Sequence, residues 1–233
     1  MFLGRTKGVL QMSDKKILCI GDSLGKPRGR PSLVRLEDTW PKLLAKNLRG
    51  HQIIRNFNPS KQSKDIVEEV QNDSLCYYAD IIIVQVGVVE LYPRCLKRIE
   101  LEIIKRLPLV RNMWKYLVSA YRPQIIKFRK KSYGSPSRYI ENLLEFEKLN
   151  LGTKIIFIPP LPHPPDFERF HSPGYNAVIG EVIKNDIFAR YFDSEFINLY
   201  ANTDALMVED GHHLSVAGHR TLAAKLIKIC EAL

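Results

Sequence analysis

Three residues near opposite ends of the chain have the types and spacing of a nucleophilic site. Ser23 follows an apolar run at residues 15–20, while Asp210 and His213 lie three residues apart near the other end. A serine hydroxyl is a poor nucleophile until a base removes its proton, and the usual base is a histidine that a carboxylate orients. With this spacing the Asp210 carboxylate can reach one ring nitrogen of His213 while the other faces outward. The pattern predicts a Ser/His/Asp site.

Each of these signals also has a structural interpretation. Gly, Asp and Ser are ordinary turn residues after a strand, so the segment around Ser23 is weak by itself, and its pairing with the second motif carries the prediction. We interpret His212 and His219 as structural, with His212 facing solvent and His219 packing the last helix. His163 and His171 lie in a proline-rich loop after the fourth expected strand, where they either line the site or are exposed.

Apolar runs alternating with helical patterns indicate the elements that must hold these residues. β-branched runs that end in Gly or Pro are typical of buried parallel strands, and segments with apolar residues at helical spacing separate them. The expected strands are residues 15–20, 52–57, 79–87, 154–158 and 196–199, and the expected helices are residues 37–48, 63–70, 138–149, 174–191 and 215–232. This order predicts an α/β protein, a three-layer α/β/α sandwich with a mainly parallel five-stranded sheet. Ligands bind such sheets at the carboxyl ends of the strands, where Ser23 is expected.

A basic stretch interrupts the alternation between the third and fourth strands. Residues 94–138 contain thirteen Lys or Arg and two acidic residues, a net charge of +11, whereas the rest of the chain sums to −1. Aliphatic and aromatic residues occur among these cations at roughly helical spacing, and Pro108 and Pro123 are expected to divide the stretch into shorter helices. We predict a basic helical insertion at about 94–138, within one domain that spans residues 1–233.

The charge of this insertion favours an anionic partner. Three roles are open: a solvated helical face, a lid that attracts an anionic glycan or lipid-linked substrate, or a surface that docks on an anionic membrane. Trp114, Tyr116, Tyr121 and Phe128 among the cations favour the last two. Nucleic acid is not the expected partner, because no recognised nucleic-acid-binding module accompanies the charge.

The composition limits the class of protein further. With 233 residues, of which 45% are hydrophobic, the chain can bury a substantial core. It has no apolar run long enough for a membrane span, and residues 1–16 lack the features of a secretory signal, so we expect a cytoplasmic protein, at most peripheral at the inner membrane surface. Cys19, Cys76, Cys95 and Cys230 are scattered without a Cys-x-x-Cys pair, so we expect reduced thiols rather than zinc ligands or disulfides.

The two motifs together resemble the GDSL-type, or SGNH, hydrolases. Gly21-Asp22-Ser23-Leu24, and Asp210-Gly211-His212-His213-Leu214 followed by Gly218-His219, stand in the order and at the separation of that family, and Tyr175-Asn176 and residues 196–200 are also similar to it. The resemblance covers nearly the whole chain apart from the insertion. It implies a flavodoxin-like sandwich in which Ser23 is the nucleophile, His213 the general base and then acid, and Asp210 the group that orients His213. It implies no metal and no organic cofactor.

The chain departs from this family in the groups that would stabilise an oxyanion. The family uses the nucleophile's own N–H, a glycine N–H after the second strand and an asparagine side chain after the third. Here Val89 occupies the place of the asparagine, and residues 56–60 contain no glycine. Loss of one such donor can lower the rate about a hundredfold to a thousandfold.

Four residues are the candidates for completing this part of the site. Asn58 and Arg94 are the predicted replacements for the missing donors, and Gly87 is retained from the family pattern. Glu90 is predicted either to orient Arg94 or touch substrate, or to be a solvated loop acid.

The altered block after the third strand is also similar to a subgroup of the family associated with bacterial surface-polysaccharide biosynthesis. The resemblance implies a serine esterase or acyl hydrolase that acts on an O-acyl ester of a carbohydrate, expected to be O-acetyl, through an acyl-enzyme. Two alternatives stay open: a sugar O-acyltransferase with the same triad, and a non-catalytic glycan-binding or membrane-docking protein that retains the fold. The expected partner is an acylated carbohydrate or glycolipid, anionic if the insertion contacts it.

Overall fold

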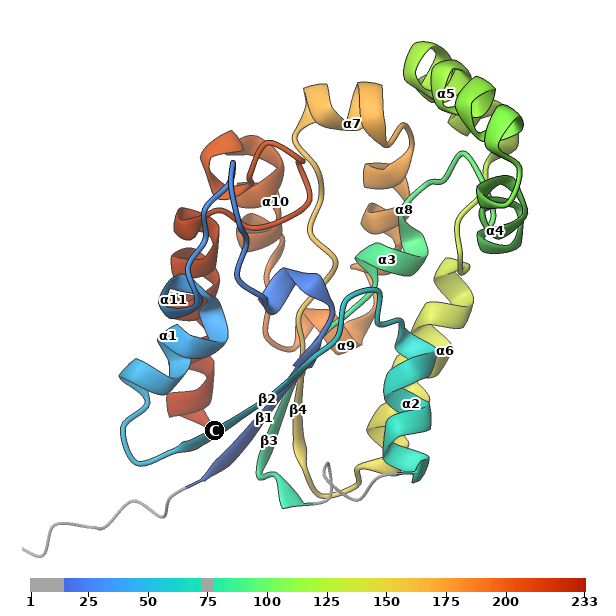
Figure 1. Cartoon of the computed structure of the whole chain (residues 1–233). Helices are drawn as coiled ribbons and strands as arrows, with labels where there is room; N and C mark the ends of the chain where they lie inside the picture. The colour runs from blue at the N-terminus through green and yellow to red at the C-terminus, as the bar shows by residue number, and fades with distance from the viewer. Residues whose placement is uncertain (1–14, 73–77) are drawn as a thin grey trace, which may run out of the picture.

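A parallel sheet forms the centre of the molecule in the computed structural model, which describes residues 15–72 and 78–233 (Figure 1). Its strands are β1 (Lys16–Gly21), β2 (Gln52–Phe57), β3 (Ile81–Gln85) and β4 (Lys154–Phe157), in the order β2-β1-β3-β4. The chain passes from β2 on one side of β1 to β3 on its other side. The loops therefore diverge at the carboxyl end of β1, which is the place where open parallel sheets bind ligands.

Successive strand residues pack against opposite helical layers, because side chains alternate across a strand. In β1, Leu18 and Ile20 belong to one core cluster and Ile17 and Cys19 to the other. All four are at most 2% exposed. The sheet is thus buried on both faces at β1, β3 and β4, which explains the nearly continuous apolar runs of these strands, whereas the edge strand β2 is only partly buried.

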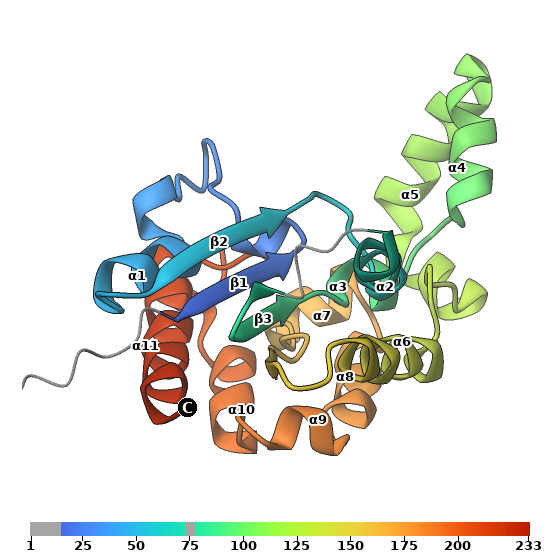
Figure 2. The ribbon, with the colours of Figure 1, turned by 90° about the horizontal axis from the view of Figure 1, so that it is seen from below.

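Helices cover both faces of this sheet (Figures 1 and 2). The layer around Leu18 and Ile20 includes α2 (Ser63–Asn72), α6 (Pro136–Leu149), α8 (Tyr175–Val182) and α9 (Asp186–Ala189), and the other layer includes α1 (Trp40–Asn47), α10 (Ser194–Asn202) and α11 (Val216–Ala232). Shorter elements lie in the connections: η1 (Ser23–Gly25), η2 (Leu36–Asp38), α3 (Val88–Leu91), α7 (Pro165–His171) and η4 (Asp204–Leu206). The three-layer α/β/α class is confirmed.

The prediction of a fifth strand at residues 196–199 is wrong, because these residues form part of helix α10. The side chain of Asp193 accepts a hydrogen bond from the backbone N–H of Phe196, which caps the helix start. Ile197 and Tyr200, three residues apart, are both buried, so the apolar positions follow the helical period. In the described part of the chain the sheet has four strands. Similarly, the single helix expected over residues 174–191 is two, α8 and α9.

Local capping explains two of the helices that were predicted correctly. The Ser215 hydroxyl accepts from the backbone N–H of Gly218 and starts α11, as the sequence predicts. The Ser135 hydroxyl accepts from Arg138, and Pro136 occupies the first turn of α6.

The insertion forms two helices, α4 (Arg98–Lys105) and α5 (Pro108–Arg129), which project from the body of the molecule (Figures 1 and 2). We call residues 98–129 the arm. Pro108 begins α5, as expected for a residue without an N–H, and two helical pieces of α5 meet at a kink just before Pro123, so both prolines divide the stretch as predicted. The helix is interrupted at Tyr121, which has non-helical backbone angles, and it continues to Arg129.

The remaining predictions concern cysteines and the membrane. Cys19, Cys95 and Cys230 are buried free thiols, and Cys76 lies outside the described residues. Among the helices of the described segments, none is long and apolar enough to cross a membrane.

Candidate active site

Ser23 lies immediately beyond the carboxyl end of β1. The backbone N–H of Asp22 donates to the Gln85 carbonyl of β3 at 3.1 Å and prolongs the pairing of the two strands. The buried Asp22 carboxylate then accepts from the backbone N–H of Leu24 at 2.8 Å. This contact caps the short helix η1 that Ser23 begins, and it fixes the serine where the sheet meets the surface.

The second motif is held by a tight turn before α11. The backbone N–H of Val208 donates to the His213 carbonyl at 2.9 Å, and that of Gly211 donates to Val208 at 2.8 Å. Gly211 has φ 68°, and a Cβ at this position would collide with the ring of Phe167. A glycine is therefore required in this turn, and the turn presents His213 to Ser23.

The structure brings Ser23, His213 and Asp210 into one hydrogen-bonded chain. Ser23 Oγ lies 2.9 Å from His213 Nε2, and His213 Nδ1 lies 2.7 Å from Asp210 Oδ2. Asp210 Oδ1 also accepts from the backbone N–H of His213 at 3.0 Å. Burial by itself raises the pKa of Asp210, but the hydrogen bond from His213 and the nearby His212 lower it well below its usual value. Asp210 is thus a carboxylate at neutral pH, suited to orient the imidazole.

Arg28 is a site residue that the sequence analysis missed. Its Nη1 lies 2.8 Å from His213 Nε2, and its Nη2 donates to Asp210 Oδ2 at 3.1 Å. A guanidinium can only donate, so His213 Nε2 carries its lone pair toward both Arg28 and the Ser23 hydroxyl. The available signal was a cation five residues beyond Ser23, but the contact spans 185 positions and depends on the fold.

A cleft of about 510 Å³ opens beside this triad. It is lined by Asp22, Ser23, Leu24, Arg28, Pro59, Ser60, Val88, Val89, Tyr92, Arg94, Arg122, Tyr133, His212 and His213. Three of these residues are arginines, and two of the arginines come from the predicted insertion. The cleft is therefore cationic around a serine and histidine pair.

Of the four residues predicted to complete the oxyanion site, Arg94 alone lines the cleft. Asn58 is exposed beyond β2, where its neighbours Pro59 and Ser60 face the cleft in its place. Gly87 precedes α3 with φ 123°, and a Cβ there would meet Tyr139 and Pro160, so its role is close packing.

Glu90, predicted either to orient Arg94 or touch substrate or to be a solvated loop acid, is buried, does not line the cleft and contacts Ser63 rather than Arg94. Glu90 is 3% exposed and accepts hydrogen bonds from both the backbone N–H and the hydroxyl of Ser63, each at 2.8 Å. Its backbone carbonyl also accepts from Tyr133 and Gly134. Burial raises the pKa of Glu90, and the Ser63 bonds oppose that shift. The side chain of Glu90 thus contacts the start of α2, and its backbone carbonyl contacts the loop before α6. Glu90 therefore links these two segments.

Ser60 is a second cleft residue that the sequence analysis did not single out. It has φ 65°, in the left-handed region that favours glycine, although it carries a side chain. It follows β2, where the resembled family has a glycine whose N–H faces the oxyanion. The sequence showed that a glycine was missing after β2, but it did not show that Ser60 would take a left-handed conformation beside the cleft.

The other histidines divide between the site and the core. His219 is 1% exposed and its Nδ1 accepts from the backbone N–H of Trp40, so the packing role predicted for it is confirmed. His212, predicted to face solvent, instead lines the cleft and contacts the rings of Tyr92 and His213. Burial and the neighbouring His213 lower the pKa of His212 to about 4, so it is neutral at pH 7.

His163 is fully buried beneath the cleft and does not line it. Its Nδ1 lies 2.7 Å from the Ser172 hydroxyl, and its ring stacks on Tyr175 with centroids 4.1 Å apart. Burial lowers the pKa of His163 to about 3. His171 lies at the end of α7, where its backbone carbonyl accepts from Arg122.

Asp210, His212 and His213 offer ligand atoms that lie within 4.8 Å of one another, so this cluster has donors of the kind that hold a metal ion. Both ring nitrogens of His213 already contact Ser23 and Asp210. A cation bound there would have to break the contacts of the triad, so the donor set fits a nucleophilic site better.

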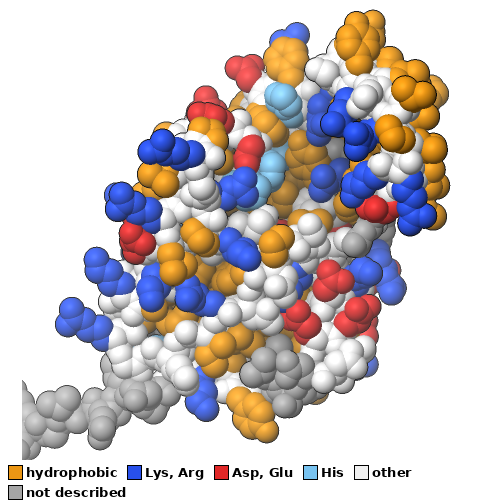
Figure 3. All heavy atoms as spheres, viewed as in Figure 1, with side chains coloured by type: hydrophobic (Ala, Val, Ile, Leu, Met, Phe, Trp, Pro, Cys, Tyr) orange, Lys and Arg blue, Asp and Glu red, His pale blue; other side chains and the backbone are white. Residues whose placement is uncertain are grey.

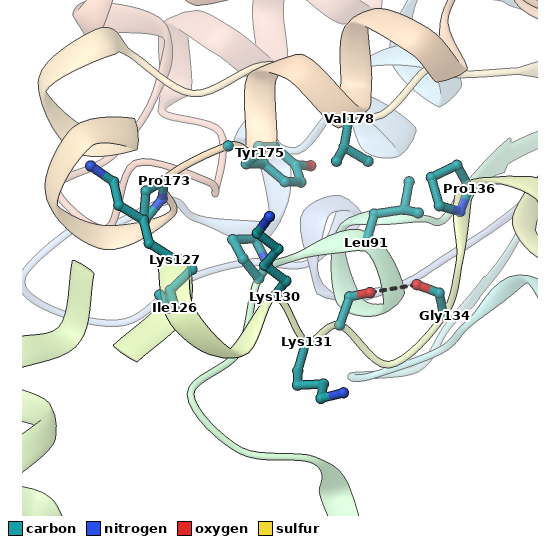
Figure 4. Close-up of a pocket in the computed structure, with 13 residues that line it drawn as sticks. Leu91, Ile126, Lys127, Lys130, Lys131, Gly134, Pro136, Pro173, Tyr175 and Val178 are labelled. Atoms are coloured by element: carbon teal, nitrogen blue, oxygen red, sulfur yellow. Dashed lines mark hydrogen bonds between the residues drawn. The ribbon is translucent and has the colours of Figure 1, made fainter. Parts of the chain in front are cut away.

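A second cavity of about 450 Å³ lies behind the cleft at the base of the arm (Figure 4). Its wall is mainly apolar and includes Leu91, Pro93, Ile126 and Val178, with three lysines of residues 127–131 around it. Leu91 and Pro93 face this cavity, whereas the alternating Tyr92 and Arg94 face the cleft. One short segment therefore separates the two spaces.

The parallel sheet and its flanking helices have the fold of solved hydrolases described as G-D-S-L family lipolytic proteins and acetylxylan esterases. The chain is similar in structure to the lipase/acylhydrolase from Enterococcus faecalis, with 14% identity, a TM-score of 0.62, and coverage of 94% of this chain and 96% of that one. It is similar to a G-D-S-L family lipolytic protein from Veillonella parvula, with 13% identity, a TM-score of 0.59, and coverage of 94% and 99%. It is also similar to a catalytic mutant of an acetylxylan esterase from Geobacillus stearothermophilus, with 17% identity, a TM-score of 0.56, and coverage of 94% and 95%. At these identities the similarity shows a shared fold.

No protein-family profile and no curated protein sequence matches the chain.

Proposed function

We propose that this protein is a serine esterase whose nucleophile is Ser23. The observation that carries the proposal is the continuous chain of contacts from Ser23 Oγ to His213 Nε2 at 2.9 Å and from His213 Nδ1 to Asp210 Oδ2 at 2.7 Å. It joins residues 190 positions apart at the ligand-binding edge of the sheet. Such a constellation is recognised by its geometry rather than by sequence position.

The reaction follows from these contacts in two steps. His213 Nε2 takes the hydroxyl proton as Ser23 Oγ bonds to the ester carbonyl carbon, and the Asp210 carboxylate stabilises the imidazolium that forms. The imidazolium then protonates the leaving alkoxide, which departs as an alcohol and leaves an acyl-Ser23 ester. In the second step His213 takes a proton from water, the hydroxyl adds to the acyl carbon, and Ser23 leaves with the proton returned.

Backbone donors supply the oxyanion site in this proposal. The N–H groups of Ser23 and Ser60 are the donors we assign, because both residues line the cleft and Ser60, which follows β2, has a φ of 65° in the region that favours glycine. Val89 lines the cleft where the family has an asparagine, and its side chain cannot donate. We therefore expect slower turnover than a site with all three donors.

We assign an O-acetyl ester of a carbohydrate as the substrate. The acetylxylan esterase of similar fold is named for such an ester, and a serine-to-alanine and a histidine-to-alanine variant of it are described as catalytic mutants. The cationic, partly open cleft beside Ser23 accommodates a polar acyl donor. A sugar hydroxyl in place of water in the second step would make the protein an O-acyltransferase, which product analysis with an acetylated donor distinguishes.

A non-catalytic glycan-binding protein is the second candidate. Two observations favour it. Val89 has no donor at the place of the family's oxyanion asparagine, and Arg28 contacts His213 Nε2, the nitrogen that must accept the Ser23 proton.

Labelling with a fluorophosphonate probe decides between these functions. We expect the wild type and a Ser137→Ala control, which changes an exposed serine of α6, to be labelled, and Ser23→Ala not to be. Hydrolysis of 4-nitrophenyl acetate should show the same pattern. If all three proteins are labelled equally, or none is labelled and none hydrolyses the ester, the esterase proposal is wrong.

A further inference from the structure

The insertion supplies part of the cleft wall. Arg94, Arg122 and Tyr133 belong to it, and all three line the cleft that contains Ser23. Arg94 is anchored by its backbone, whose N–H donates to the Lys131 carbonyl at 2.7 Å. The insertion is thus attached to the site through cationic residues.

The Arg94 guanidinium is held between two aromatic rings. Its Cζ lies 4.9 Å from the ring centroid of Tyr92 and 4.8 Å from that of Tyr133, and its Nη2 donates to the Val89 carbonyl at 3.2 Å. Its Nε is buried without a hydrogen-bond partner. Burial lowers the pKa of Arg94, yet an arginine stays charged at neutral pH. Stacking on tyrosines orients the planar group without neutralising it.

Arg122 reaches the same wall from α5. Its Nε donates to the His171 carbonyl at 3.0 Å, and its Nη2 lies 3.5 Å from the Tyr92 hydroxyl. Within residues 15–72 and 78–233, no carboxylate forms an ion pair with Arg94 or Arg122, in contrast to Arg28, which pairs with Asp210. Two oriented guanidinium groups therefore face the cleft without a counter-charge.

We propose that Arg94 and Arg122 form an anion-binding subsite that takes a carboxylate or phosphate group of the substrate. This proposal rests on the proposed function for the position of the ester at Ser23, and the anion-binding property itself does not depend on turnover. A guanidinium offers a planar fork of donors that matches both oxyanions, and a partly buried position strengthens the interaction. The substrate class is then an acyl ester of an acidic or phosphorylated sugar.

The experiment measures binding to the full-length Ser23→Ala protein by calorimetric titration. The ligands are glucuronate, glucose 6-phosphate and uncharged glucose. We expect at least one charged sugar to bind about tenfold or more tightly than glucose at low salt, and to weaken as salt is added. Arg94→Met and Arg122→Met should each lower that affinity by about tenfold, whereas Arg138→Met, which removes an exposed arginine of α6, should leave it unchanged.

Arg94→Lys keeps the charge and loses the fork, so an intermediate affinity is expected. The subsite is overturned if the charged sugars bind no better than glucose, or if both methionine variants bind them as the parent does. Binding of charged sugars to a protein that no fluorophosphonate labels would retain the subsite and overturn the esterase, so the two failures are distinguishable.

A different observation, on the arm, carries a second proposal. Its helices expose large apolar side chains: Ile99, Ile103, Leu107, Leu109, Val110, Met113, Tyr116, Tyr121 and Phe128. Leu109 is 87% exposed and Phe128 90%. Ile126 is the one fully buried residue of α5, and the other apolar residues of that helix are at least partly exposed.

Cations accompany this apolar surface. Lys105, Arg106, Arg111, Lys115 and Lys127 are exposed on the same two helices. Figure 3 shows hydrophobic side chains along the outer edge of this region, with Lys and Arg side chains next to them. Two copies of such a surface would repel each other, whereas an anionic bilayer satisfies both its charge and its apolar groups.

We propose that the arm docks on the surface of an anionic lipid bilayer. Leu109 and Met113, four residues apart on one face of α5, would enter the interface, and the cations would contact lipid head groups. Such docking would place the cleft close to a lipid-linked or surface glycan.

Vesicle flotation with the full chain tests this second proposal. We expect binding to phosphatidylcholine vesicles that contain phosphatidylglycerol, at least tenfold weaker binding to pure phosphatidylcholine, and weakening by salt. Leu109→Glu with Met113→Glu should lower binding about tenfold, whereas Leu151→Glu, an equally exposed leucine at 85% beyond α6, should not. The docking proposal is wrong if the Leu109→Glu/Met113→Glu variant and the Leu151→Glu variant bind vesicles equally. It is also wrong if the protein self-associates and only the Leu109→Glu/Met113→Glu variant abolishes that association.

Discussion

The carboxyl edge of the sheet and the arm differ in the burial and hydrogen bonding of their side chains. At the sheet edge, Asp22 and His213 are buried, and short hydrogen bonds join Ser23, His213 and Asp210. In the arm, large apolar side chains such as Leu109, Met113 and Phe128 are exposed on α5. A reacting group needs a position fixed to a fraction of an ångström, whereas a surface that meets a soft or extended partner does not. The chain therefore combines a rigid site with an arm that the fold does not require.

Removal of the base should give the largest effect. His213→Ala is expected to lower kcat/KM for 4-nitrophenyl acetate by roughly 10⁴-fold or more, because triad members act as a unit. Far-ultraviolet circular dichroism should be unchanged. His171→Ala, which changes a histidine outside the cleft, is the matched control. A loss below tenfold would show that His213 is not the base.

Truncation of one apolar side chain in each region tests the difference in packing. Leu143 in α6 is fully buried, so Leu143→Ala should lower the free energy of unfolding by about 2–5 kcal/mol. Met113 in the arm is 58% exposed, and Met113→Ala should change it by less than about 0.5 kcal/mol. Urea unfolding measures both values. Comparable losses would mean that the arm is packed in the folded protein.

The buried Asp22 should make the rigid region sensitive to pH. Burial raises the pKa of Asp22 to about 7, above the value of about 4 of an unfolded aspartate, so the folded state holds the proton more tightly. The wild type should therefore lose stability as pH rises from about 4 to 7, by up to about 1.4 kcal/mol per pH unit. Asp22→Asn cannot titrate and should lack this loss, whereas the exposed Asp204→Asn should keep it. The free energy of unfolding is measured at pH 5, 6, 7 and 8 for both proteins. If it changes with pH by the same amount in the wild type and in Asp22→Asn, this assignment is wrong.

The Arg28 contact should give the smallest effect. Arg28 and the Ser23 hydroxyl both use the one lone pair of His213 Nε2, and the cation opposes the charge that His213 gains in the reaction. Because the Arg28 side chain is 31% exposed, the pair is worth about 1 kcal/mol, and Arg28→Met should raise kcat for a neutral ester by up to roughly fivefold. Arg35→Met, at an exposed arginine of the same loop, should have no effect. A decrease in kcat would show that Arg28 assists the reaction at His213 instead.

The sequence predicted the elements that depend on local patterns. β1, β3 and β4 were predicted because each is a buried apolar run, and α11 was located by its Ser215 cap. The signal for β2 was weaker, because polar residues interrupt it and none of its side chains is fully buried. Residues 196–199 were misassigned because a short, mostly apolar run of four residues suits a strand and a helix equally. The Asp193 cap and the burial of Ile197 and Tyr200 decided for the helix.

The candidate site divides in the same way. The sequence by itself determined the triad candidates, since Ser23, Asp210 and His213 belong to two short motifs with a known chemical logic. It also showed that an oxyanion asparagine was missing, because Val89 stands in its place.

Tertiary structure alone decided what surrounds the triad. Glu90 turned inward to Ser63, Arg28 folded back onto His213, and Arg122 came from the arm to the wall beside Arg94. The Glu90 and Arg28 contacts join positions 27 and 185 residues apart. The direction of a side chain and its long-range contacts depend on how the helices and the sheet pack together. The local spacing of residues in the sequence therefore does not predict them.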